Sequence, residues 1–133
     1  MGSPESSAAR RHLRLAEGLI GTVRVGASSS EFDLRNAFSR SYYALFHASR
    51  GYLWARGFDV DSLGKKHGRL HDEMERKLGT WFGDSIRKSY ESRRKADYVP
   101  EWTQPPLYKC LEDLKVARGH CYYLLGEARE FVS

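Results

Sequence analysis

The hydrophobic positions of the chain recur with the 3.6-residue period of amphipathic helices, and no segment keeps the two-residue alternation expected for strands. Near the N-terminus, for example, one helical face carries Leu13, Ala16, Leu19, Ile20 and Val23. The pattern predicts helices over residues 6–25, 31–56, 62–78, 84–99 and 106–133. Because the connections are short, the sequence predicts an all-α fold, a five-helix up-and-down antiparallel bundle.

Glycine and proline mark the ends of these segments. Gly57 and Gly79 follow the second and third predicted helices, and Pro100 ends the fourth. Pro105 and Pro106 cannot lie in a helix interior, although Pro106 suits the first turn of the last helix. No linker divides the chain, so residues 1–133 are expected to form one domain, with a flexible N-terminus over residues 1–5.

Composition limits the class of protein. The chain has 133 residues, of which 41% are hydrophobic and 29% charged, the balance of one globular domain. It has no long apolar run and no signal-peptide pattern, so a membrane location is not expected. Its two cysteines, Cys110 and Cys121, share one helical face and are interpreted as core thiols. Two cysteines do not form a disulfide framework, so we expect a cytoplasmic protein.

The net charge of +5, from 22 basic and 17 acidic residues, allows contact with phosphate groups without requiring it. The fourth predicted helix concentrates this charge in a basic cluster of Arg87, Lys88, Arg93, Arg94 and Lys95. Tyr90 and Tyr98 lie among these cations, and the combination of charge with stacking surfaces is typical of nucleic-acid contact. The alternative is an ordinary solvated helix face.

The second predicted helix has two distinct faces. Its core face is expected to carry Phe38, Ser41, Tyr42, Leu45, Ala48, Ser49 and Tyr52. A separate stripe contains Asn36, Arg40, Tyr43, His47 and Arg50. This stripe has no acid, which suits a phosphate or an acidic partner surface. The alternative is structural: His47 hydrogen-bonds a neighbouring helix, and the hydroxyls of Tyr42 and Tyr43 are satisfied within the fold.

Two histidines of the third predicted helix are four residues apart and therefore share a face. His67 and His71 could hold a metal ion, but no ligating cysteines lie nearby. A structural or solvent-facing role is favoured, and neither a metal nor a cofactor is expected. The residues predicted to bind RNA or nucleotide are Arg40, Tyr43, Arg50, Arg87, Arg94 and Lys95.

Three stretches resemble the HEPN domains, the higher eukaryote and prokaryote nucleotide-binding family. Residues 40–50 (RSYYALFHASR) resemble the signature of the family's second helix. Residues 66–70 (KHGRL) resemble the His-Gly stretch that opens its third helix, and residues 93–98 (RRKADY) its late fourth-helix "R…ADY" stretch. The order of the stretches and of the helices is similar too.

The resemblance implies a compact all-α bundle that is usually a homodimer. Many members are RNases of toxin–antitoxin, abortive-infection or CRISPR systems, and they are often encoded beside a nucleotidyltransferase that acts as antitoxin. Active members carry an Arg, four to six residues, and then a His, and two copies of this motif form a metal-independent site across the dimer. Three tryptophans in a small bundle, Trp54, Trp81 and Trp102, also favour a homodimer.

The chain departs from this motif, because Arg93 is followed after four residues by Tyr98. A tyrosine with a pKa near 10 is a poor general base at neutral pH, so the catalytic motif is interpreted as degenerate. Two alternatives stay open: a metal-independent endoribonuclease that uses Arg93 with Tyr98 or borrows His47, and a pure protein-interaction module. We expect Arg93 and Tyr98 to meet in a cleft at a dimer axis, which requires the helix to end or bend near Ala96.

Overall fold

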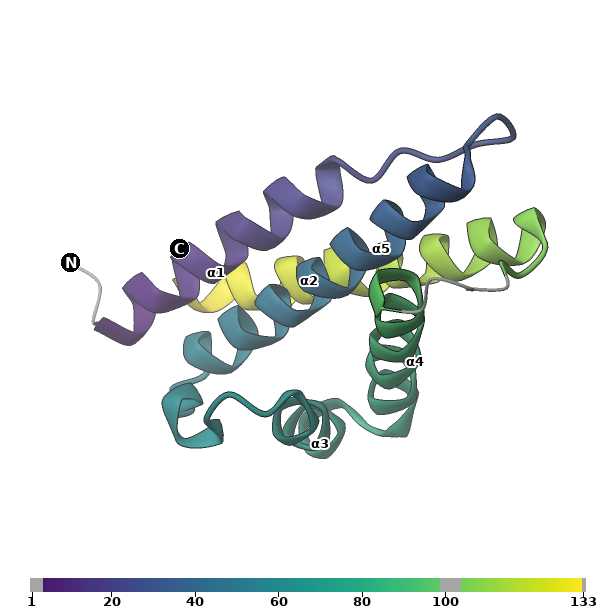
Figure 1. Cartoon of the computed structure of the whole chain (residues 1–133). Coiled ribbons are helices and arrows are strands. Elements are labelled where there is room, and N and C mark those ends of the chain that lie inside the picture. Colours follow the sequence, from purple (N-terminus) through teal and green to yellow (C-terminus); the bar gives the residue numbers. More distant parts are fainter. Residues whose placement is uncertain (1–3, 99–103, 133) are drawn as a thin grey trace.

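The computed structural model describes residues 4–98 and 104–132, and within these ranges the chain is all-α, as predicted (Figure 1). The helices are α1 (Pro4–Gly21), α2 (Glu31–Ala55), α3 (His67–Leu78), α4 (Thr80–Tyr98) and α5 (Leu107–Val132), with a 3₁₀ turn η1 (Val60–Leu63). In Figure 1, α1 and α2 run antiparallel, and α4 crosses α2 steeply. α5 runs in the same general direction as α2.

Helix α2 lies at the centre of the bundle and packs against α1, α4 and α5. All seven residues of its predicted core face are buried. Four further apolar residues of α2 are also buried: Leu34, Ala37, Ala44 and Leu53. A helix packed on three sides buries more than one stripe, which leaves only a narrow face of α2 near solvent.

Two helix starts differ from the sequence-based bounds by more than two residues, and a glycine with a positive φ precedes both. α3 begins at His67 rather than Ser62, since the preceding residues form η1 and Gly64 then reverses the chain at φ 68°. α4 begins at Thr80, directly after Gly79 at φ 109°. Both φ values lie in a region that favours glycine.

The α1–α2 contact depends on a small residue. A Cβ atom added to Gly51 would lie 2.7 Å from Cδ2 of Leu13 and 3.2 Å from the carbonyl oxygen of Ala9. Glycine therefore sets the close approach of these two helices. At the other end of α2, the Ser30 hydroxyl caps the helix by accepting a hydrogen bond from the Asp33 N–H at 3.1 Å.

Both cysteines are buried and free, which confirms their interpretation as core thiols. Burial raises the pKa of Cys121 to about 12, so this thiol stays protonated at neutral pH. Within the described residues, no helix combines the length and apolar character needed to span a bilayer. Trp81 is 45% exposed, Trp54 is half-buried, and Trp102 lies outside the described residues.

Candidate nucleic-acid interface

The three stretches that carry the HEPN resemblance meet at one place in the structure. Tyr42 and Tyr43 come from α2, His67 from the first position of α3, and Arg93 and Tyr98 from the last turns of α4. We call these residues, together with Tyr90, the tyrosine–arginine cluster. It joins three helices through side-chain contacts between residues that are far apart in the sequence.

Arg93 is the centre of the cluster and is only 6% exposed. Its Nη2 donates a hydrogen bond to the hydroxyl of Tyr43 and lies 3.5 Å from that of Tyr98. Its Nε lies 3.4 Å from a carboxylate oxygen of Asp97. Its guanidinium carbon is 5.0 to 5.9 Å from the centroids of four rings, those of Tyr42, Tyr43, Tyr90 and Tyr98. These contacts occupy the guanidinium within the fold.

Tyr98 lies beside Arg93, as the sequence predicted. α4 extends to Tyr98, two residues beyond the position near which an end or a bend was expected. The two residues meet because both side chains are long, with the Arg93 guanidinium 5.2 Å from the ring centroid of Tyr98. Tyr98 itself is 68% exposed, so its ring covers the guanidinium and faces solvent.

The imidazoles of α3 are held by a buried tyrosine. The hydroxyl of Tyr42 lies 2.6 Å from Nδ1 of His67 and 2.9 Å from Nε2 of His71. Burial lowers the pKa of His71 to about 4, and burial together with the charge of Arg93 lowers that of His67. Both rings are therefore neutral at pH 7. Both rings thus have a structural contact with α2. Among the described residues, no group of three or more His, Cys, Asp or Glu side chains could hold a metal ion.

A second imidazole pair lies between α1 and α2. Nδ1 of His47 is 3.0 Å from Nδ1 of His12, and the rings stack with centroids 5.2 Å apart. Burial, with a smaller effect of the Arg50 charge, lowers the pKa of His12 to about 4 and also lowers that of His47. His47 thus contacts a neighbouring helix, as the structural alternative expected. His12 was not singled out from the sequence, because its partner is 35 residues away.

The predicted stripe of α2 lies between α1 on one side and α4 on the other. Tyr43 turns toward Arg93 of α4, whereas His47 turns toward His12 of α1. Arg40 is exposed and, with Asn36, lines a small hollow of about 240 Å³ beside the end of α1. The stripe is therefore a shallow surface, and its members do not all converge on one point.

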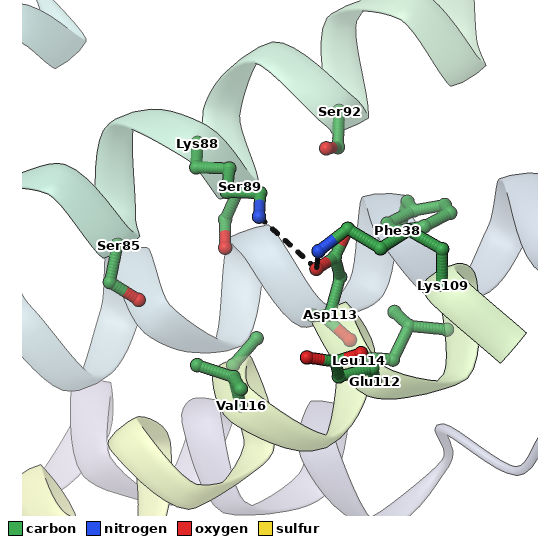
Figure 2. Close-up of a pocket in the computed structure, with 12 residues that line it drawn as sticks. Phe38, Ser85, Lys88, Ser89, Ser92, Lys109, Glu112, Asp113, Leu114 and Val116 are labelled. Atoms are coloured by element: carbon green, nitrogen blue, oxygen red, sulfur yellow. Dashed lines mark hydrogen bonds and ion pairs between the residues drawn. The ribbon is translucent and has the colours of Figure 1, made fainter. Parts of the chain in front are cut away.

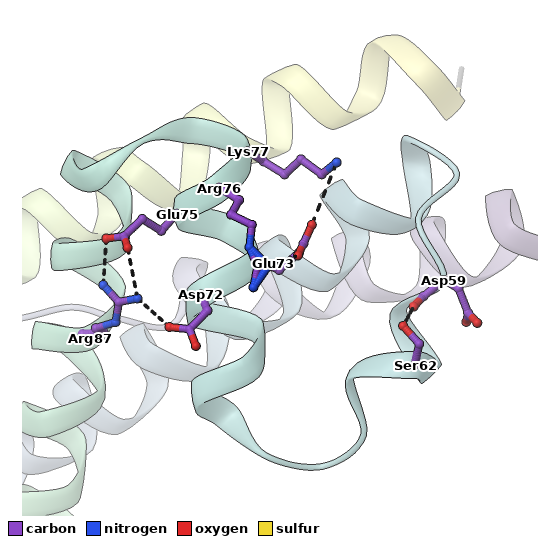
Figure 3. A network of polar contacts seen from close by, with 8 residues as sticks. All are labelled: Asp59, Ser62, Asp72, Glu73, Glu75, Arg76, Lys77 and Arg87. Carbon is purple, nitrogen blue, oxygen red and sulfur yellow. Dashed lines mark hydrogen bonds and ion pairs between the residues drawn. The ribbon is translucent and has the colours of Figure 1, made fainter.

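Acidic residues of α3, α5 and α4 itself neutralise part of the basic cluster. Figure 3 shows Arg87 reaching from α4 to two carboxylates of α3, at 2.7 Å from Asp72 and 2.8 Å from Glu75. The hydrogen bonds to Glu75 and Asp72 raise the pKa of Arg87 further above its usual value. Lys88 pairs with Asp113 of α5, and Arg94 with the exposed Glu91. The cluster is less positive than the sequence of α4 indicates.

A separate polar pocket of about 130 Å³ lies between α2, α4 and α5 (Figure 2). In it, Lys88 and Lys109 lie 3.2 and 3.3 Å from the same Asp113 oxygen. At one side, the Ser85 hydroxyl is 2.6 Å from Nδ1 of His120. This pocket was not predicted, because its lining comes from three helices and follows no motif.

Comparison of the chain with known protein families, with curated proteins and with solved structures finds no match.

Proposed function

We propose that the protein is a HEPN-like RNA- or nucleotide-binding protein. In this proposal it is a homodimer and one component of a two-gene toxin–antitoxin or defence system, with a nucleotidyltransferase-type partner. The supporting observation is the tyrosine–arginine cluster, in which all three stretches that resemble the family meet.

The exposed residues around the cluster would make the RNA contacts. Arg40, Arg94 and Lys95 are exposed and supply positive charge for phosphate groups. Tyr98 offers a solvent-facing ring on which a base can stack. Arg93 is buried, so its proposed role is to position the tyrosines rather than to bind phosphate directly.

A titration of single-stranded RNA in a salt series tests this proposal. Binding should weaken steeply as salt increases, because phosphate contacts release counterions. The variant Tyr98→Ala should lower the affinity about fivefold or more, since stacking contributes about 1–3 kcal/mol per base. Arg14→Gln, which removes an exposed cation of α1, a helix that contributes no residue to the cluster, is the control and should change little. Affinity that is independent of salt and of Tyr98 would contradict the proposal.

Metal-independent RNA cleavage is the second candidate, because the stacked pair of His12 and His47 places two imidazoles together beside Arg50. Burial keeps both rings neutral at pH 7, but the lowered pKa also makes each ring a weaker base than a free imidazole, so any cleavage should be slow. We expect little or no cleavage in the presence of a chelator, and Tyr98→His should increase it by placing an imidazole beside Arg93. Brisk cleavage by the unchanged protein that His47→Gln abolishes would instead identify His47 as the base.

A further inference from the structure

We propose that a groove between α5 and the α1–α2 connection binds a small amphipathic organic anion, an apolar body that carries one carboxylate or phosphate. This α5 groove is lined by Val23, Arg24, Val25, Leu111, Leu114, Lys115 and Arg118. It has a volume of about 520 Å³. Pockets for small molecules in proteins have volumes of about 300 to 1,000 Å³, so the groove has the size for such a ligand. The proposal is independent of RNA binding.

The floor of the groove is apolar because of how its two walls are built. After α1 ends at Gly21, the chain is non-helical, and Val23 is buried while Arg24 is exposed. On α5, Leu111 and Leu114 occupy adjacent positions of one helical face. Val25 and Leu111 are only half-buried, so apolar surface remains open to the groove.

The rim of the groove is positive. Arg24, Lys115 and Arg118 are all exposed, and no acidic residue lines the groove. Among the described residues, none of these three cations forms an ion pair. The pocket of Figure 2 is different, because its two lysines already share the carboxylate of Asp113. The α5 groove therefore presents positive charge for which its lining holds no counterion.

These two features together define the ligand. An RNA strand would use the three cations but leave the apolar floor uncovered. A neutral hydrocarbon would cover Val25 and Leu111 but supply no anionic partner for the cations, of which Arg118 lies over the ring of Tyr122. A compact molecule with an apolar body and a single anionic head satisfies both, with the body on the floor and the head near Lys115 or Arg118.

Decanoate is a suitable probe, and octanoate, acetate and decyltrimethylammonium are the matched comparisons. We expect saturable 1:1 binding of decanoate by calorimetry, with amide shifts in the NMR spectrum that map to residues 23–25 and 111–118. Octanoate should bind about five- to fifteenfold more weakly, because it buries two fewer methylenes. Acetate and decyltrimethylammonium, which lack the body and the negative charge respectively, should not bind measurably.

Variants assign the binding to the groove. Arg24→Gln, Lys115→Gln and Arg118→Gln should each weaken decanoate binding about two- to fivefold, as expected for exposed charge pairs. Leu111→Asp should abolish it by placing a negative charge on the floor, and circular dichroism checks that this variant folds. The control Arg14→Gln, at a residue that does not line the groove, should leave decanoate binding unchanged.

Four results would overturn the proposal: no saturable decanoate binding, equal binding of decyltrimethylammonium, shifts that map elsewhere, or a dimer whose interface covers the groove. The RNA titration gives a separate readout. Lys115→Gln and Arg118→Gln should affect decanoate binding but not RNA binding, while Tyr98→Ala should affect RNA binding but not decanoate binding. Failure of either site therefore leaves the other one testable.

Discussion

Arg93 of α4 donates a hydrogen bond to the hydroxyl of Tyr43 on α2, although 50 residues separate them along the chain. Two more contacts fix the same end of α4 to α2. Arg35 donates to the carbonyl oxygen of Ala96 at 2.7 Å, and the Ser39 hydroxyl lies 3.2 Å from a carboxylate oxygen of Asp97. The end of α4 is therefore held by polar contacts as well as by packing, and the tyrosine–arginine cluster is preorganised.

Removal of the Tyr43 hydroxyl should destabilise the fold without removing a stacking surface. Tyr43→Phe leaves the buried Arg93 guanidinium without its closest hydrogen-bond acceptor, which should lower the free energy of unfolding by about 1–3 kcal/mol. Urea denaturation measures this change. Tyr98→Phe is the comparison, and it should cost less than about 0.5 kcal/mol because Tyr98 is exposed and its contact with Arg93 is long. Equal costs for the two variants would show that Arg93 does not depend on Tyr43.

Acidification should destabilise the protein between pH 6.5 and about 4. Burial lowers the pKa of both His12 and His71 from 6.5 to about 4 in the folded state. The unfolded chain therefore binds protons first, so the stability present above pH 6.5 is lost as the pH falls toward 4. Each histidine should contribute a loss of about 1–2 kcal/mol between pH 7 and pH 5.

Urea denaturation at several pH values tests this dependence. His12→Asn should show a smaller loss of stability over the same pH range, because one of the two histidines with the most strongly lowered pKa is gone. A protein whose stability stays constant or rises on acidification would contradict the assignment of neutral, buried imidazoles.

Two glycine substitutions should have opposite effects. In Gly51→Ala, the new methyl would lie 2.7 Å from Cδ2 of Leu13 and 3.2 Å from the carbonyl oxygen of Ala9, so the Leu13 side chain must move or α1 must shift, at a cost of about 1–3 kcal/mol. Gly119 lies within α5 with open space around its Cβ position. Gly119→Ala should therefore stabilise the protein by about 0.5–1 kcal/mol, since alanine is the better helix former. Thermal and urea unfolding measure both variants, and a neutral Gly51→Ala would show that the two helices are not in close contact.

Two arginines of the basic cluster should differ in their importance for RNA. Arg87 is paired with Asp72 and Glu75, whereas Arg94 pairs only with the exposed Glu91. Arg94→Gln should therefore weaken RNA binding more than Arg87→Gln does, by about two- to fivefold. Arg87→Gln should instead lower the free energy of unfolding by about 0.5–1 kcal/mol, with a smaller effect at high salt. The reverse order of RNA affinities would place the contact surface toward α3.

The helical class and the core face of α2 could be predicted because both depend on local periodicity. Phe38 and Tyr52, for example, are buried where the pattern placed them. The start of α3 could not be predicted, because residues 60–63 are also able to form a helix and η1 is set by its tertiary position. Gly64, which has a positive φ directly after η1, is the one residue in the sequence that indicates a break before α3.

The candidate site could be predicted only in part, because periodicity assigns a face to a residue but not a partner. The stripe of α2 was found, yet the partner of His47 is His12 on another helix. The charge of Arg87 was counted, but Asp72 and Glu75 lie 15 and 12 residues away and neutralise it. Partners of this kind become visible only when the helices are packed together.

The hydroxyl of Tyr42 has consequences for the protons of both rings that it touches. It carries one hydrogen, so it can donate to only one of its two neighbours, Nδ1 of His67 or Nε2 of His71. The other ring must then carry its own hydrogen on the facing nitrogen. The tautomers of the two imidazoles are thereby coupled, because a proton that moves on one ring requires a matching move on the other. α2 and α3 therefore share a single chain of hydrogen bonds, in which every donor points the same way along the chain.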